Sequence, residues 1–193
     1  MDEVKPDKRE AILQATLQLV AEHGFHDAPC SLIAERAGVA AGTIYRYFEN
    51  KDVLILELYR ELETKINSAL LDGYSLDKPF RERFIHLVTG LLNFFILHPK
   101  EFKYIEQFHN SPYGVAFRRD RIMGQSEDCG IYVELFKQGI AQQVLKDLPL
   151  AVLCDLAFGP TVSVARNHIL GVVQLDDNLI SQIAAACWDS MKR

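Results

Sequence analysis

The chain has 193 residues and a formal net charge of −5, and 49% of its residues are hydrophobic. This length suits one large domain, or a small domain joined to a larger one, with enough apolar residues for a real core. The longest apolar run, residues 84–97, is interrupted by polar residues and is too short to span a bilayer, so we expect no membrane partner. Residues 1–10 are charged and lack the apolar stretch of a signal peptide, which predicts a cytoplasmic protein.

Helical periodicity extends along the whole chain, without a strand signal of weight, an internal repeat or a low-complexity segment. The pattern predicts an all-α fold of about nine helices. Glycine and proline residues set most of the expected breaks, because glycine ends helices readily and proline cannot continue them. The expected helices cover residues 8–23, 29–37, 41–48, 52–71, 78–97, 100–110, 115–138, 149–170 and 176–191.

The stretch from residue 28 to residue 51 predicts two short helices joined by a tight turn; it reads A-P-C-S-L-I-A-E-R-A-G-V-A-A-G-T-I-Y-R-Y-F-E-N-K. Gly38 stops the first helix, because glycine adopts a left-handed cap without steric cost. Gly42 lets the backbone at the start of the second helix approach a bulky neighbour closely. This is the pattern of a helix-turn-helix motif, whose second helix enters a DNA major groove. A helical hairpin with partly buried tyrosines and solvated charges would explain the same residues equally well.

One string within this stretch is more specific. It reads I-A-x-x-A-G-V-x-x-G-T-I-Y-R-Y-F-x-x-K, runs from Ile33 to Lys51 without a gap, and resembles the DNA-binding domain of the TetR family of transcriptional regulators. The resemblance implies a three-helix DNA-binding domain over residues 1–51 and a larger helical domain for ligand binding and dimerisation over residues 52–193. It also implies a homodimer on a double-stranded palindromic DNA operator, acting as a repressor that a small-molecule inducer releases. The positions it places against DNA are Ser31, Ala41, Gly42, Thr43, Tyr45, Tyr47 and Lys51.

The side chains of this motif also have a chemistry that suits DNA. Hydroxyls of Thr43, Tyr45 and Tyr47 can donate to phosphate oxygens, and Arg46 and Lys51 supply positive charge. The negative net charge of the whole chain neither proves nor excludes DNA as a partner, because binding depends on the local surface. We therefore add Arg46 to the predicted DNA contacts.

The resemblance implies a ligand pocket in the larger domain, and the aromatic residues of that domain suit an apolar one. Asp155 and Phe158 are three positions apart on an expected helix and so share a face. A ring beside a carboxylate suits a small apolar or aromatic inducer and would accommodate a cationic one. Arg166 returns to nearly the same face and would instead neutralise Asp155, and each aromatic residue would equally serve in plain core packing. The candidate ligand residues are Phe94, Phe95, Tyr104, Phe108, Phe136, Asp155 and Phe158.

The last two expected helices, 149–170 and 176–191, carry more apolar residues than the core of one protomer needs. Two-fold pairing with a second copy would bury these residues in a four-helix interface. The candidate contacts of this homodimer are Val164, His168, Ile183, Cys187 and Trp188.

The sequence contains no motif typical of a metal site, a cofactor site or an enzyme. The six histidines form no H-E-x-x-H or similar ligand set, so we expect no metal site. The sequence also lacks a glycine-rich phosphate-binding loop, so we expect no cofactor. No G-x-S-x-G motif or other nucleophile–base pair supports an enzyme. An all-α enzyme and a helical adaptor that binds only protein are the alternatives, and an assay for sequence-specific DNA binding separates them from a regulator.

Overall fold

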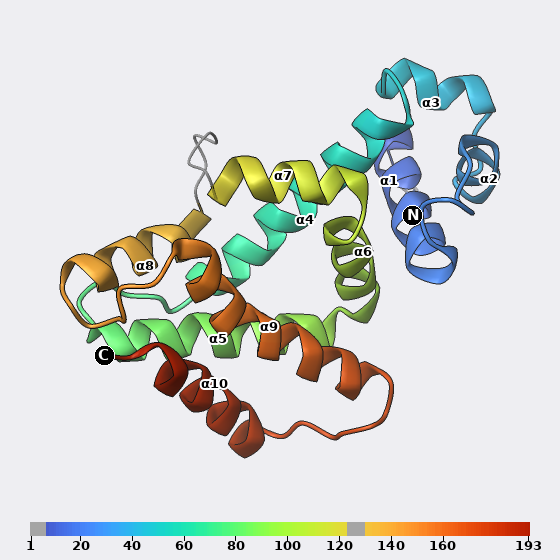
Figure 1. Cartoon of the computed structure of the whole chain (residues 1–193). Helices are drawn as coiled ribbons and strands as arrows, with labels where there is room; N and C mark the ends of the chain where they lie inside the picture. The colour runs from blue at the N-terminus through green and yellow to red at the C-terminus, as the bar shows by residue number, and fades with distance from the viewer. Residues whose placement is uncertain (1–6, 123–129) are drawn as a thin grey trace. The chain divides into compact units, whose positions relative to one another are not determined.

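The computed structural model describes residues 7–122 and 130–193, and its helices confirm the predicted all-α class (Figure 1). Helical periodicity predicted about nine helices, whereas the described residues contain ten. The expected helix over residues 115–138 corresponds to both α7 and α8, and residues 123–129 lie outside the described part of the chain. The ten helices are α1 (Lys8–His23), α2 (Cys30–Arg36), α3 (Ala41–Tyr47), α4 (Lys51–Leu71), α5 (Phe80–Leu97), α6 (Pro99–His109), α7 (Pro112–Ile122), α8 (Gly130–Ala141), α9 (Leu150–Ile169) and α10 (Asp177–Met191).

Contacts between the helices divide the chain into two compact units. Unit 1 comprises Met1–Glu63 and Lys100–Arg118, and unit 2 comprises Thr64–Pro99 and Arg119–Arg193. The chain therefore passes between the units within α4, α6 and α7. This grouping of contacts differs from the expected domain boundary after residue 51, and that boundary stays a prediction. No helix of the described residues is long and apolar enough to cross a membrane.

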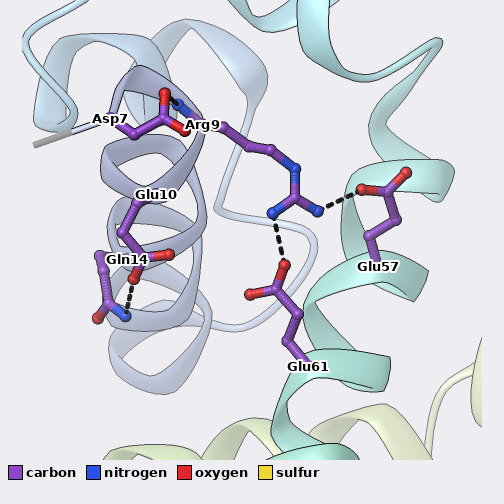
Figure 2. A network of polar contacts seen from close by, with 6 residues as sticks. All are labelled: Asp7, Arg9, Glu10, Gln14, Glu57 and Glu61. Atoms are coloured by element: carbon purple, nitrogen blue, oxygen red, sulfur yellow. Dashed lines mark hydrogen bonds and ion pairs between the residues drawn. The ribbon is translucent and has the colours of Figure 1, made fainter.

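Unit 1 contains the three N-terminal helices and the first half of α4. Helix α1 packs against α2 and α3, which also pack against each other. Arg9 at the start of α1 donates to Glu61 Oε1 at 2.6 Å and to Glu57 Oε2 at 2.7 Å, both on α4 (Figure 2). These hydrogen bonds, to Glu61 first and then to Glu57, raise the pKa of Arg9 because they favour its charged form. The network joins α1 to α4 at one end of the three-helix group.

Aromatic side chains attach α6 to the first half of α4, also within unit 1. Tyr104 is fully buried, and its hydroxyl donates to the Ile55 carbonyl at 2.8 Å. Tyr59 of α4 stacks on Phe108 of α6, with ring centroids 3.9 Å apart. Burial raises the pKa of Tyr104 far above its ordinary value of 10.0, because the tyrosinate would lose its hydration.

Unit 2 is built around α5, which packs against α9 and α10, while α8 packs against α5 and α9. The ring of Phe84 on α5 lies 5.7 Å from the Trp188 ring on α10 and 6.4 Å from the Phe136 ring on α8. Phe136 in turn lies 6.1 Å from Phe158 on α9. A continuous aromatic cluster therefore joins all four helices, and it explains why α5 is apolar around most of its circumference.

Replacing Tyr104 with Phe tests the attachment of α6 to α4. The change removes one buried hydrogen bond, so we expect the free energy of unfolding at neutral pH to fall by about 1 kcal/mol. The unfolded chain ionises Tyr104 above pH 10.0, whereas the folded chain keeps it protonated, so this residue lowers wild-type stability as pH rises beyond that value. Urea unfolding at neutral and alkaline pH should show a shallower alkaline loss in Tyr104→Phe. An equal slope in both proteins would contradict the buried position of this hydroxyl.

Candidate nucleic-acid interface

Helices α2 and α3 form the predicted helix-turn-helix motif within unit 1 (Figure 1). Both lie within one residue of the predicted ranges 29–37 and 41–48 at each end. Gly38 has a φ of 67°, a left-handed conformation that favours glycine, and this confirms its role in stopping α2. The N–H groups of Gly38 and Val39 donate to the carbonyls of Glu35 and Ala34 at 3.1 and 3.0 Å, which closes the turn.

Helix α3 is held by its one buried residue, Ile44, which is fully enclosed. Phe48, directly after the helix, is also buried and adds a second apolar anchor. Between these two anchors, Tyr45 is 59% exposed and Tyr47 is 39% exposed. The predicted DNA contacts of α2 and α3 therefore lie on an accessible surface: Ser31, Ala41, Gly42, Tyr45, Arg46 and Tyr47 are exposed, and Thr43 is half-buried.

Gly42 is not required by the fold of the protomer. A Cβ atom added there would meet no heavy atom within 4 Å, and the residue has no left-handed φ. Glycine in a helix costs roughly 0.5–1 kcal/mol relative to alanine. The open space beside Gly42 is therefore on the solvent side of α3, where a partner could approach the backbone closely.

Lys51 is placed differently from the other predicted contacts. Its ammonium donates to the Phe25 carbonyl at 2.7 Å, and the side chain is half-buried. The bond ties the start of α4 to the segment after α1. Lys51 thus has a structural role that the sequence motif did not indicate.

Cys30 is a neighbour of the exposed surface that sequence reasoning missed. It is half-buried on α2 and hydrogen-bonded to the side chain of Tyr45 on α3. That hydrogen bond raises the pKa of the Tyr45 hydroxyl. No spacing rule relates Cys30 to Tyr45, because they lie on different helices and meet only through the turn.

The predicted ligand residues do not form one group. Tyr104 and Phe108 are buried in unit 1, whereas the other predicted ligand residues belong to unit 2. In unit 2, Phe136 and Phe158 are neighbours, and Phe94 and Phe95 lie beside each other on α5. Asp155 is exposed and Phe158 is half-buried on the same helix, and their role in ligand binding stays a prediction.

A groove of about 700 Å³ lies along α5 in unit 2, with walls from α4, α5 and α10. Of the predicted ligand residues, only Phe94 lines it. Among the residues that the structure describes, no group of three His, Cys, Asp or Glu side chains could hold a metal ion.

The predicted dimer contacts also divide into two sets. Cys187 and Trp188 are buried inside unit 2, where the Trp188 ring lies 6.0 Å from Phe80, so they are core residues and the prediction of an interface role for them is wrong. The apolar side of α10 faces α5 of its own protomer, which the sequence pattern alone does not distinguish from a second copy. Val164, His168 and Ile183 are half-buried, and His168 Nδ1 accepts a hydrogen bond from the Leu175 N–H at 3.2 Å.

A matched pair of glycine substitutions tests the geometry of the turn. Gly38→Ala should lower the free energy of unfolding by about 1 kcal/mol, because alanine is strained at a φ of 67°. Gly42→Ala should instead leave stability unchanged or raise it by about 0.5 kcal/mol, because the added methyl group meets no atom. Chemical denaturation of both variants measures the difference. Equal effects at the two positions would contradict the turn described here.

Comparisons with known proteins agree with this geometry. The family described as "Bacterial regulatory proteins, tetR family" matches residues 12–58, and "Tetracyclin repressor-like, C-terminal domain" matches residues 79–192. An HTH-type transcriptional regulator of Haemophilus influenzae is 30% identical over 164 residues, which cover 81% of this chain and 85% of that protein.

Solved structures show the same fold over nearly the whole chain. A TetR-family protein of Vibrio parahaemolyticus has a TM-score of 0.77 at 34% identity, with 97% of this chain and 99% of that chain covered. A TetR-family regulator of Marinobacter aquaeolei has a TM-score of 0.82 at 26% identity, with 96% and 95% covered. The chain therefore belongs to the TetR family of helix-turn-helix transcriptional regulators, and it is a DNA-binding regulator rather than an enzyme.

Proposed function

We propose that this regulator binds a palindromic DNA operator as a homodimer, with α3 of each protomer in a major groove, and represses transcription. The observation that carries the proposal is the exposed side of α3. Ile44 anchors the helix, so the side chains of Tyr45, Arg46 and Tyr47 are left accessible to a partner.

The accessible residues of α3 are proposed to contact two different parts of the DNA, the phosphates and the base edges. Tyr45 and Tyr47 carry hydroxyls that donate to phosphate oxygens, and Arg46 neutralises a phosphate, which fixes the protein on the duplex. Thr43 and Ala41, at the start of α3, lie where this motif meets base edges, and a methyl group there suits the thymine methyl. The absence of a side chain at Gly42 lets the helix backbone come close to DNA, which explains a glycine that the protomer itself does not need.

The exposed side of α9 supports the homodimer. Gly159 and Pro160 are both exposed in the middle of this helix, and a Cβ atom added at Gly159 would meet no heavy atom within 4 Å. Both residue types destabilise a helix interior, and the described residues supply no packing reason for the glycine. Close approach of α9 from a second copy supplies one. Val164 lies one turn further along, so we keep it, with His168 and Ile183, as the proposed interface contacts.

A small apolar or aromatic ligand in unit 2 is the proposed signal. The ligand must bind more tightly to the dimer geometry that fits DNA poorly, because only differential affinity shifts the equilibrium. The aromatic cluster of the buried Phe84 and Phe136 and the half-buried Phe158 is the apolar part of unit 2 that suits such a compound. Binding there would release the operator and allow transcription.

Replacing Arg46 with Ala, or Tyr47 with Phe, tests the DNA surface. Each change removes one proposed phosphate contact, so we expect about tenfold weaker binding for Arg46→Ala and a smaller loss for Tyr47→Phe. The slope of log affinity against log salt should fall by about 1 for Arg46→Ala. An operator selected from random-sequence DNA with the wild type, followed by fluorescence anisotropy at several salt concentrations, measures both quantities.

Lys137→Ala is the matched control for that experiment. Lys137 is an exposed residue of unit 2, and its replacement removes the same charge at a place far from α3 in the sequence. Its affinity and salt slope should equal those of the wild type. If Arg46→Ala behaves like Lys137→Ala, α3 does not read the operator.

Replacing Val164 with Glu tests the dimer. A carboxylate in an apolar interface is costly, so the dissociation constant of the dimer should rise at least about tenfold. Val115→Glu makes the same substitution at a valine of unit 1 that is 61% exposed, and it should leave assembly unchanged. Sedimentation equilibrium compares the two. Identical association of both variants would exclude Val164 from the interface.

A further inference from the structure

Arg83 is a charged residue in the interior of unit 2. It lies on α5 and is only 5% exposed, beside the buried ring of Phe80. A buried charge is expensive unless it is paired and hydrogen-bonded, so such a residue requires an explanation.

The partners of Arg83 within the chain leave part of its guanidinium unused. One terminal nitrogen, Nη1, donates to the amide oxygen of Gln138 at 3.0 Å, and the group lies over the Phe80 ring at 5.3 Å from its centroid. The Nε atom is buried and has no hydrogen-bond partner. Among the described residues no carboxylate forms an ion pair with Arg83, and its other terminal nitrogen donates no hydrogen bond.

The unused part of Arg83 has a specific geometry. Nε and Nη2 point their N–H groups in the same direction from one edge of the planar guanidinium, and this edge matches the two oxygens of a carboxylate. A neutral amide oxygen at Nη1 does not compensate the positive charge. The carboxylate of a bound anion would accept hydrogen bonds from both nitrogens and would also neutralise the buried positive charge.

The surroundings of Arg83 suit the rest of such a molecule. The Phe80 ring beneath Arg83 lies 6.0 Å from the Trp188 ring, and Trp188 lies 5.7 Å from Phe84, which belongs to the aromatic cluster with Phe136 and Phe158. At the far end of that cluster, the Tyr132 ring lies 4.4 Å from Phe158, and its buried hydroxyl has no hydrogen-bond partner either. The interior of unit 2 thus combines apolar rings with two buried polar groups that find no partner among the described residues.

We propose that unit 2 binds an organic carboxylate with an apolar or aromatic body, whose carboxylate pairs with the Nε–Nη2 edge of Arg83. This inference rests on the proposed ligand control and specifies its ligand class. It replaces the cationic compound expected from Asp155, because that carboxylate is exposed whereas Arg83 supplies a buried positive charge.

Two pairs of probes test the ligand class on the wild-type protein. Decanoate and naphthoate carry a carboxylate, while decanamide and naphthamide have nearly the same shape without the charge. Calorimetry should give carboxylate affinities at least about tenfold higher than those of the matching amides. The carboxylates should also raise the unfolding temperature and release the operator. Equal affinity for acids and amides, or no binding of either acid, would overturn the inference.

Two arginine variants then locate the site. Arg83→Met keeps the length of the side chain but removes the charge, and it should weaken carboxylate binding at least about tenfold while leaving amide binding unchanged. Arg81→Met makes the same change at an exposed position of α5 and should bind carboxylates like the wild type. If Arg83→Met does not fold, Arg83→Lys, which keeps the charge but lacks the two-nitrogen edge, should show the same loss. Unchanged carboxylate binding in the Arg83 variant would place the site elsewhere.

Operator affinity of the ligand-free wild type is measured in parallel, so the two proposals fail separately. A protein that binds carboxylates but no specific DNA would contradict the proposed function alone. A protein that binds its operator and responds only to uncharged or cationic compounds would contradict the carboxylate site alone.

Discussion

The burial of Ile44 is the constraint on which the proposed DNA-reading surface depends. Helix α3 has seven residues, too few for a stable helix in isolation, and Ile44 is the only one of them in the core. Because Ile44 points inward, Tyr45 and Tyr47 on either side of Arg46 are left accessible. The turn at Gly38 and the packing of α1 on both short helices fix where that anchor lies. One buried side chain thus determines which face of α3 meets a partner.

Three residues of this protein lack a compensating contact among the described residues, and the proposed partners would explain them. Gly42 and Gly159 have open space beside them, and neither adopts a left-handed φ. Arg83 has the opposite character, because it is enclosed but incompletely paired. In each case the residue lowers the stability of the folded protomer, and no contact among the described residues compensates for that loss. A DNA backbone, a second α9 and an organic anion are the partners that would supply those contacts.

The sequence predicted the fold class and the helix-turn-helix motif well, because helix periods and glycine stops are local signals. Gly38 illustrates this, since its left-handed conformation follows from its place at the end of α2. Long-range partners were not accessible in the same way. The sequence made Tyr104 a candidate ligand residue and Trp188 a candidate dimer contact, but it could not show that one is buried in unit 1 and the other in unit 2. The contact of Cys30 with Tyr45 depends on the folded turn, so no pattern in the sequence could reveal it.

Amide chemical-shift mapping by NMR with a selected operator duplex tests most directly whether α3 is the DNA-reading element. The chain would be titrated with the operator and with a scrambled duplex of equal length and composition. We predict that the largest operator-specific shifts fall on Ser31 and on Ala41–Tyr47, and that the scrambled duplex produces smaller shifts that disappear with added salt. Operator-specific shifts confined to unit 2, with α3 unaffected, would contradict the assignment of α3 as the reading helix.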